Sequence, residues 1–75
     1  MNIESLEFTP KGWDYARSRQ RRTDNFDMWA VVTEISRLGG KARSDQISMY
    51  VFGDDKIRTS KAIGQCKSNG LIKKY

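Results

Sequence analysis

The chain of 75 residues is long enough for one small domain, which would bury roughly 60% of the surface that its unfolded form exposes. Fourteen Lys and Arg residues outnumber nine Asp and Glu residues, and the resulting net charge of +5 favours a polyanionic partner. One Cys and no His exclude an intramolecular disulfide, a structural zinc site and a catalytic pair that depends on His. No apolar run reaches the ~20 residues of a membrane helix, and no basic segment precedes an apolar one as in a signal peptide. We therefore expect a cytoplasmic protein with no membrane contact, no catalytic residues, no bound metal and no cofactor.

Residues 1–23 are predicted to form an N-terminal arm and a short basic helix. Residues 1–8 are typical of an extended arm whose apolar side chains can pack on a core. Thr9 and Pro10 are typical of a helix start, because Thr can cap a helix and Pro is preset for the first helical position. This pattern predicts a helix over roughly residues 10–20, although Gly12 disfavours it. The apolar side chains of the arm are Ile3, Leu6 and Phe8.

Residues 24–75 are predicted to form the main domain, which begins with its clearest helix. Asp24 is expected to cap this helix, and Gly39-Gly40 is expected to end it. Apolar residues between these positions recur at helical spacing, which predicts one buried stripe. The stripe comprises Met28, Val31, Val32, Ile35 and Leu38, and Phe26 and Trp29 extend it toward the first helix.

Two shorter helices are predicted after an extended segment at residues 41–43. Ser44 is expected to cap the first of them, and Gly53 is expected to end it. Asp54 and Asp55 are expected to open the next helix, which is the third of the main domain, and Thr59 and Ser60 are its alternative start. The side chains expected to face inward are Ile47, Tyr50 and Val51 in the second helix and Ile57, Ala62, Ile63 and Cys66 in the third.

The order of these elements resembles a winged helix-turn-helix domain over roughly residues 24–75. In that family the recognition helix ends in an apolar residue and three polar ones, and a Gly-Leu-Ile then leads into the wing. Cys66, residues 67–69 and Gly70-Leu71-Ile72 match these places, and Ser44-Asp45-Gln46-Ile47 resembles the start of the family's second helix. The resemblance implies a mainly α fold, with a winged helix-turn-helix-like three-helix core, a short or truncated β wing and an extra N-terminal helix.

The sequence departs from the family's pattern at the wing and at the turn before the third helix. The family's wing is usually a hairpin, whereas here a single predicted strand over residues 71–75 follows the third helix, and it could pair with residues 41–43. Asp54 and Asp55 place two acids close to where phosphates would lie. Helix capping is the role that we expect for these acids, since an acid at a helix start is favourable.

The resemblance implies that the third helix reads the major groove of double-stranded DNA. The charge agrees, since residues 56–75 contain six Lys and Arg residues and no acid. The residues expected to lie in the groove are Arg58, Ser60, Lys61, Gly64, Gln65 and Ser68. Those expected to bind phosphates are Arg17, Arg19, Arg21, Arg22, Arg43, Lys67, Lys73 and Lys74. For the cluster at residues 17–22, a contact with a minor groove, an RNA-binding segment and a solvated helix end are open alternatives.

We therefore predict a sequence-specific DNA-binding protein, which would be a transcriptional regulator or recombination accessory factor of a phage or mobile element, in the host cytoplasm. A homodimer would strengthen binding, since one recognition helix buries only ~600–1,000 Å². The alternative is a winged-helix module that binds a protein, such as a phage inhibitor of a host protein or complex. This alternative requires an exposed apolar patch, and burial of the patch favours DNA. The patch would comprise Leu6, Phe8, Trp13 and Tyr15.

Overall fold

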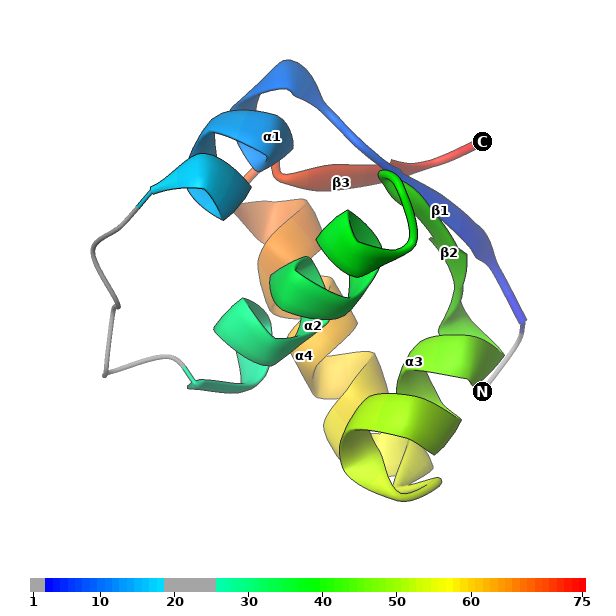
Figure 1. Cartoon of the computed structure of the whole chain (residues 1–75). Coiled ribbons are helices and arrows are strands. Elements are labelled where there is room, and N and C mark those ends of the chain that lie inside the picture. Colours follow the sequence, from blue (N-terminus) through cyan, green and yellow to red (C-terminus); the bar gives the residue numbers. More distant parts are fainter. Residues whose placement is uncertain (1–2, 19–25) are drawn as a thin grey trace.

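The computed structural model of the chain describes residues 3–18 and 26–75, which form four helices and a three-stranded antiparallel sheet. The helices are α1 (Pro10–Arg17), α2 (Phe26–Arg37), α3 (Ser44–Phe52) and α4 (Lys56–Ser68). The strands are β1 (Ser5–Phe8), β2 (Lys41–Arg43) and β3 (Ile72–Lys74). In Figure 1, α2 lies in front of α4, with α1 at the upper left, the sheet at the upper right and α3 at the lower right. The mainly helical class predicted from the sequence is confirmed.

The N-terminal strand β1 lies at the centre of the sheet, in the order β2-β1-β3. It is antiparallel to both neighbours, so that Leu6 lies opposite Ala42 of β2 and Lys74 of β3. The pairing of the last strand with residues 41–43 is therefore wrong, because β1 lies between the two. Leu6 and Phe8 alternate with more exposed residues and are buried, which holds β1 on the core, where both of its edges find a partner.

The hydrophobic core is formed by side chains from the sheet and from the helices α2, α3 and α4. α2 packs against α1, α3 and α4, and α4 also packs against α3. Fully buried apolar side chains are Leu6, Val31, Val32, Ile35, Ile47, Cys66 and Leu71. Full burial of a Leu, Ile or Val side chain contributes about 1.5–3 kcal/mol. The stripe predicted for α2 is confirmed at Met28, Val31, Val32 and Ile35.

Five side chains that were expected to face inward are exposed instead. They are Ile3, Phe26, Leu38, Tyr50 and Ile57. Ile57 lies two residues before the buried Thr59, which places it about 200° around α4 from the core. Tyr50 lies two residues after the buried Ser48 of α3, which places it about as far around that helix from the core. An apolar residue near a helix end therefore follows the orientation that the rest of the helix imposes.

Helix ends follow local sequence signals at three of the predicted places. The Thr9 hydroxyl accepts a hydrogen bond from the N–H of Gly12, and the Asp55 carboxylate accepts one from the N–H of Arg58. Gly53 ends α3 with a φ of 59°, in the left-handed region that favours glycine. The predicted cap Asp24 lies outside the described residues.

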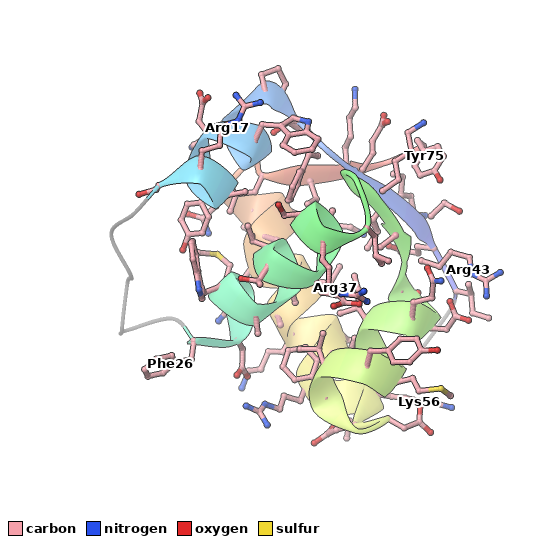
Figure 2. The ribbon with its side chains drawn as sticks, in the orientation of Figure 1. Arg17, Phe26, Arg37, Arg43, Lys56 and Tyr75 are labelled. Carbon is pink, nitrogen blue, oxygen red and sulfur yellow. The ribbon has the colours of Figure 1, made fainter. Side chains whose placement is uncertain are left out.

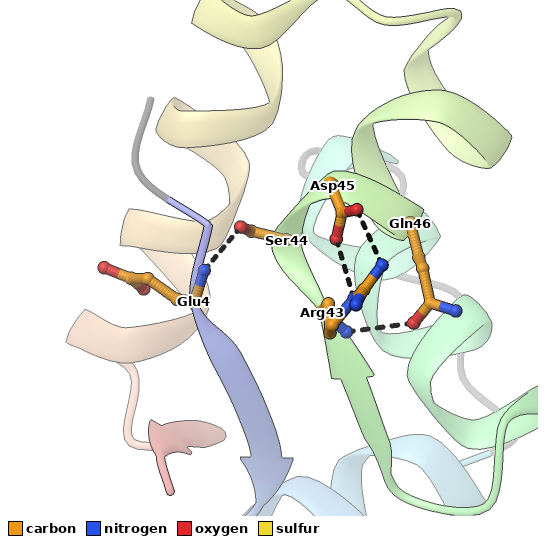
Figure 3. A network of polar contacts seen from close by, with 5 residues as sticks. All are labelled: Glu4, Arg43, Ser44, Asp45 and Gln46. Atoms are coloured by element: carbon orange, nitrogen blue, oxygen red, sulfur yellow. Dashed lines mark hydrogen bonds and ion pairs between the residues drawn. The ribbon is translucent and has the colours of Figure 1, made fainter.

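Ser44 joins α3 to β1 and does not cap α3, contrary to the prediction. Its Oγ accepts a hydrogen bond from the N–H of Glu4 at 2.9 Å, whereas Gln46 Oε1 accepts one from the N–H of Arg43 at 3.1 Å (Figure 3). Ser44 is buried, and its hydroxyl satisfies a backbone donor that comes from the other end of the chain. Gln46 therefore takes the capping role.

Gly12 has a packing role that explains its presence inside α1. A Cβ at this position would overlap the carbonyl oxygen of Leu71, so α1 crosses the start of β3 at a distance that only glycine permits. The Thr9 N–H also donates to that carbonyl oxygen, at 3.0 Å. The residue that disfavours the helix therefore fixes the helix against the sheet.

Candidate nucleic-acid interface

The helix α4 has one side in the core and the opposite side in solvent. Its buried residues are Thr59, Ala62, Ile63 and Cys66. We define the outward face of α4 by the residues on the other side, which are Ile57, Ser60, Lys61, Gly64, Gln65 and Ser68. All of these are exposed except Gly64, which is half-buried. Because α4 contains no acid, its outward face presents only cationic, polar and apolar groups to a partner.

A single row runs along the middle of the outward face of α4. Ile57, Lys61, Gly64 and Ser68 follow one another at intervals of four, three and four residues, which places them above one another on the helix. Five of the six residues predicted to lie in a DNA groove belong to the outward face. The sequence interpretation missed Ile57, although its position relative to Thr59 on a helical wheel was a signal that could have identified it.

Arg58, the sixth predicted groove residue, lies on the flank of α4 that contacts α2. Its Nε and Nη2 donate hydrogen bonds to the two carboxylate oxygens of Asp27 at 2.9 and 2.7 Å. Its guanidinium also lies 5.0 Å from the centre of the Phe52 ring. The hydrogen bonds from Arg58 lower the pKa of Asp27 below its ordinary value, so the pair stays charged at neutral pH. Arg58 therefore connects α4 to α2, and its role in a groove stays a prediction.

The predicted phosphate-binding residues on and near the sheet each have a carboxylate partner. Glu4 contacts Lys67 at 2.6 Å and Lys74 at 3.7 Å, and Glu7 contacts Lys73 at 3.7 Å. Hydrogen bonding to Lys67 lowers the pKa of Glu4, which keeps this acid ionised. We call Lys67, Lys73 and Lys74 with these two acids the paired lysine cluster. Its positive charge is partly neutralised within the molecule.

Arg43 is also paired, within its own turn of chain. Its Nε and Nη2 donate to the Asp45 carboxylate at 3.2 and 2.9 Å (Figure 3). Asp45 belongs to the first turn of α3, where a carboxylate is favourable next to the positive end of the helix. Arg43 is exposed, so a phosphate could reach it only in competition with this acid.

Five cations of residues 3–18 and 26–75 form no ion pair with an acid in those ranges. They are Lys11, Arg17, Lys41, Lys56 and Lys61. Arg17 lies 5.5 Å from the centre of the Trp13 ring, and Lys41 lies 4.8 Å from that of Tyr75. Figure 2 shows Arg17 and Lys56 at opposite ends of the molecule. Arg19, Arg21 and Arg22 lie outside the described residues.

Two acids precede α4 and have different roles. Asp55 caps the helix, as predicted for an acid at this place. Asp54 has a φ of 67°, in the left-handed region that Asp and Asn tolerate better than most residues. Its carboxylate is exposed next to the first turn of α4 and forms no ion pair with the bases that the structure describes.

Cys66 is a buried thiol that packs in the core. Burial raises the pKa of the Cys66 thiol to about 12, and its Sγ donates to the carbonyl oxygen of Met28 at 3.7 Å. No group of three or more possible metal ligands occurs among the described residues. Within the same residues, no helix is long and apolar enough to cross a membrane.

Comparisons with protein-family models, with curated proteins and with solved structures gave no significant match to this chain.

Proposed function

We propose that this protein binds double-stranded DNA in a sequence-specific way, with α4 in the major groove, and acts as a transcriptional regulator or recombination accessory factor. The observation that carries the proposal is the outward face of α4, which is free of acids and includes Lys61, a lysine that forms no ion pair with the described acids. Four buried residues hold the other side of α4 in the core, so that the helix would enter a groove as a rigid element. A major groove about 12 Å wide admits such a helix.

The surroundings of α4 support a winged helix-turn-helix arrangement. A short turn at residues 53–55 joins α3 to α4, and β3 follows α4 after residues 69–71. β1 is the antiparallel neighbour of β3, in register from Leu6–Lys74 to Phe8–Ile72. β1 therefore takes the place beside β3 that the second strand of a wing hairpin would take. In this arrangement the strand comes from the N-terminal arm.

The outward face of α4 has the side chains that direct readout of bases requires. Lys can bond the acceptors of guanine, and Gln can bond adenine through two hydrogen bonds. Lys61 and Gln65 are four residues apart, so both would reach the same stretch of groove. Ser60 adds a hydroxyl group at one edge of this face, and Ser68 adds one in its middle row. Arg17 and the arginines at residues 19–22 would bind phosphates, which position the helix without reading sequence.

The alternative, a winged-helix module that binds a protein, depends on the N-terminal apolar side chains. Leu6 and Phe8 are buried, and Trp13 and Tyr15 are half-buried against the core. Their burial favours DNA over a protein partner at this place. Trp13 still lines a pocket of about 450 Å³ together with Pro10 and Arg17, and this pocket is where a protein partner would be sought.

The proposal is tested by measuring binding to a duplex selected from random sequence and to a scrambled duplex. Binding should weaken steeply with salt, because phosphate contacts release counterions. Lys61→Ala and Gln65→Ala should each cost about 1–3 kcal/mol on the selected duplex and much less on the scrambled one. Circular dichroism checks that both variants stay folded, as exposed positions predict. Absence of binding at low salt would refute the proposal.

We also propose that the protein binds as a homodimer on two half-sites. A single small module buries little surface on DNA, and β3 is an edge strand with one unpaired side. Sedimentation of the complex measures the stoichiometry. Two chains per duplex would support the homodimer, and one chain would refute it.

A further inference from the structure

The most exposed large apolar side chain of the described residues lies on the proposed recognition helix. Ile57 is 83% exposed, more than any other large hydrophobic residue there. Single exposed apolar residues are common on protein surfaces, so exposure alone assigns no role. A role for Ile57 therefore requires a second feature of the same surface.

Gly64 provides that second feature. It lies in the same row of the outward face of α4, and a Cβ at this position would meet nothing within 4 Å. Its φ is not in the left-handed region either, so neither packing nor backbone conformation requires glycine. Glycine inside a helix costs about 0.5–1 kcal/mol relative to alanine. Ile57 and Gly64 are thus both unexplained by the folded chain itself, and both are explained if a partner covers the outward face of α4.

Charge and spacing identify duplex DNA as the partner that fits. Lys61 lies between Ile57 and Gly64 in the row and forms no ion pair with a described acid, which favours an anionic partner. Ile57 and Gly64 are seven residues apart, about 10 Å along the helix, so that both can face the same stretch of a major groove. Recognition helices place their N-terminal residues on base edges, and Ile57 is the second residue of α4.

We infer that Ile57 is a specificity-determining residue that contacts the C5-methyl group of a thymine, while Gly64 lets the DNA backbone approach α4. An isoleucine has no hydrogen-bonding group, and the thymine methyl is the one apolar group that base pairs present in the major groove. This inference rests on the proposed function. It adds that the preferred duplex contains a thymine opposite the first turn of α4.

The test combines changes in the protein with changes in the DNA. Each thymine of the selected duplex is replaced in turn by deoxyuridine, which lacks only the methyl group, and the Kd is measured for the wild type and for Ile57→Ala. At one thymine, loss of the methyl should weaken wild-type binding about four-fold, which is the effect of burying roughly one methyl group. The same replacement should leave the Kd of Ile57→Ala unchanged. Met49→Ala is the matched control, because Met49 is also exposed but lies on α3, and it should keep the wild-type response.

Three outcomes would overturn the inference. An equal response of the wild type and Ile57→Ala at every thymine would show that the side chain reads no methyl group. A loss of affinity in Ile57→Ala that is the same on selected and scrambled duplexes would make Ile57 a non-specific contact. Failure of the wild type to bind any duplex would overturn the proposed function itself, and this inference with it.

Discussion

Lys61 on α4 and Lys73 on β3 are both exposed lysines of the basic segment over residues 56–75, yet only Lys73 forms an ion pair with an acid of the described residues. The difference arises from β1, which brings Glu4 and Glu7 from the other end of the chain into the middle of the sheet. A segment without acids in the sequence is thus divided by the fold into two surfaces. The paired lysine cluster is partly neutralised, whereas the outward face of α4 keeps its charge for a partner.

Gly12 beside the sheet and Gly64 on α4 also differ, because the fold packs closely against Gly12 and leaves Gly64 open to a partner. The largest effect on stability is expected from Gly12→Ala. A Cβ at Gly12 would overlap the Leu71 carbonyl oxygen, so α1 would have to move away from the sheet. We expect a loss of about 3 kcal/mol in the free energy of unfolding, the upper part of the usual range for overpacking. Urea denaturation measures this loss. A variant as stable as the wild type would show that α1 does not depend on this close approach.

Gly64→Ala is the matched substitution on the outward face of α4. The added methyl meets open space, so the free energy of unfolding should rise by up to about 1 kcal/mol. If DNA covers this face, the same variant should bind DNA more weakly although it is more stable. Higher stability together with weaker DNA binding would show that Gly64 serves the contact with DNA and not the fold of the protein.

Charge reversal at the two lysines tests the comparison directly. Lys61→Glu and Lys73→Glu each change the net charge from +5 to +3, because one positive charge becomes one negative charge. We expect Lys61→Glu to cost about 2 kcal/mol of DNA-binding free energy and Lys73→Glu to cost less than about 1 kcal/mol, since Lys73 is already paired with Glu7. Fluorescence anisotropy at fixed salt measures both. Equal losses would mean that only the net charge determines DNA affinity and that the two surfaces do not differ in DNA binding.

Local signals explain which parts of the fold were predictable from the sequence. Thr9, Gly53 and Asp55 act on backbone groups within a few residues, so the ends of three helices follow from short motifs. The sheet depends on contacts between distant residues, such as the hydrogen bond between Glu4 and Ser44, which are 40 residues apart. Strands of three or four residues carry too little pattern to specify their partners, and the central place of β1 was therefore missed.

The residue types of the candidate site could be predicted from the sequence, but the ion pairs of its cations could not. The absence of acids in α4 and the side opposite Ile63 and Cys66 can be derived from the sequence alone, and these features identify most of the outward face. The partners of Arg58 and Lys67 are 31 and 63 residues away in the chain, so no local pattern indicates that these cations are engaged. Ile57 was assigned to the core on its apolar character, although its position two residues before Thr59 places it on the opposite side of the helix.

The paired lysine cluster should make stability sensitive to acid. The pKa of Glu4 is lowered in the folded protein, so its contribution is present above its ordinary pKa of about 4.5 and is lost as the pH falls through the lowered value. Glu4→Gln should remove up to about 1 kcal/mol at neutral pH and should lose less further stability between roughly pH 5 and pH 3 than the wild type does. Denaturation midpoints across this range measure the difference. Parallel pH profiles would show that the ion pairs of Glu4 contribute nothing.

The smallest effect is expected from Asp54→Asn, which removes an exposed acid charge that precedes α4 and forms no ion pair with the bases that the structure describes. Asn tolerates the left-handed conformation as Asp does, so stability should stay within about 0.5 kcal/mol of the wild type. DNA binding should tighten about two-fold at low salt, because an exposed charge at this distance repels phosphates by only about 0.5 kcal/mol, and the gain should vanish at high salt. Glu7→Gln makes the same change in net charge on the sheet and releases Lys73. A larger gain for Asp54→Asn would place the DNA over α4, and a larger gain for Glu7→Gln would place it over the sheet.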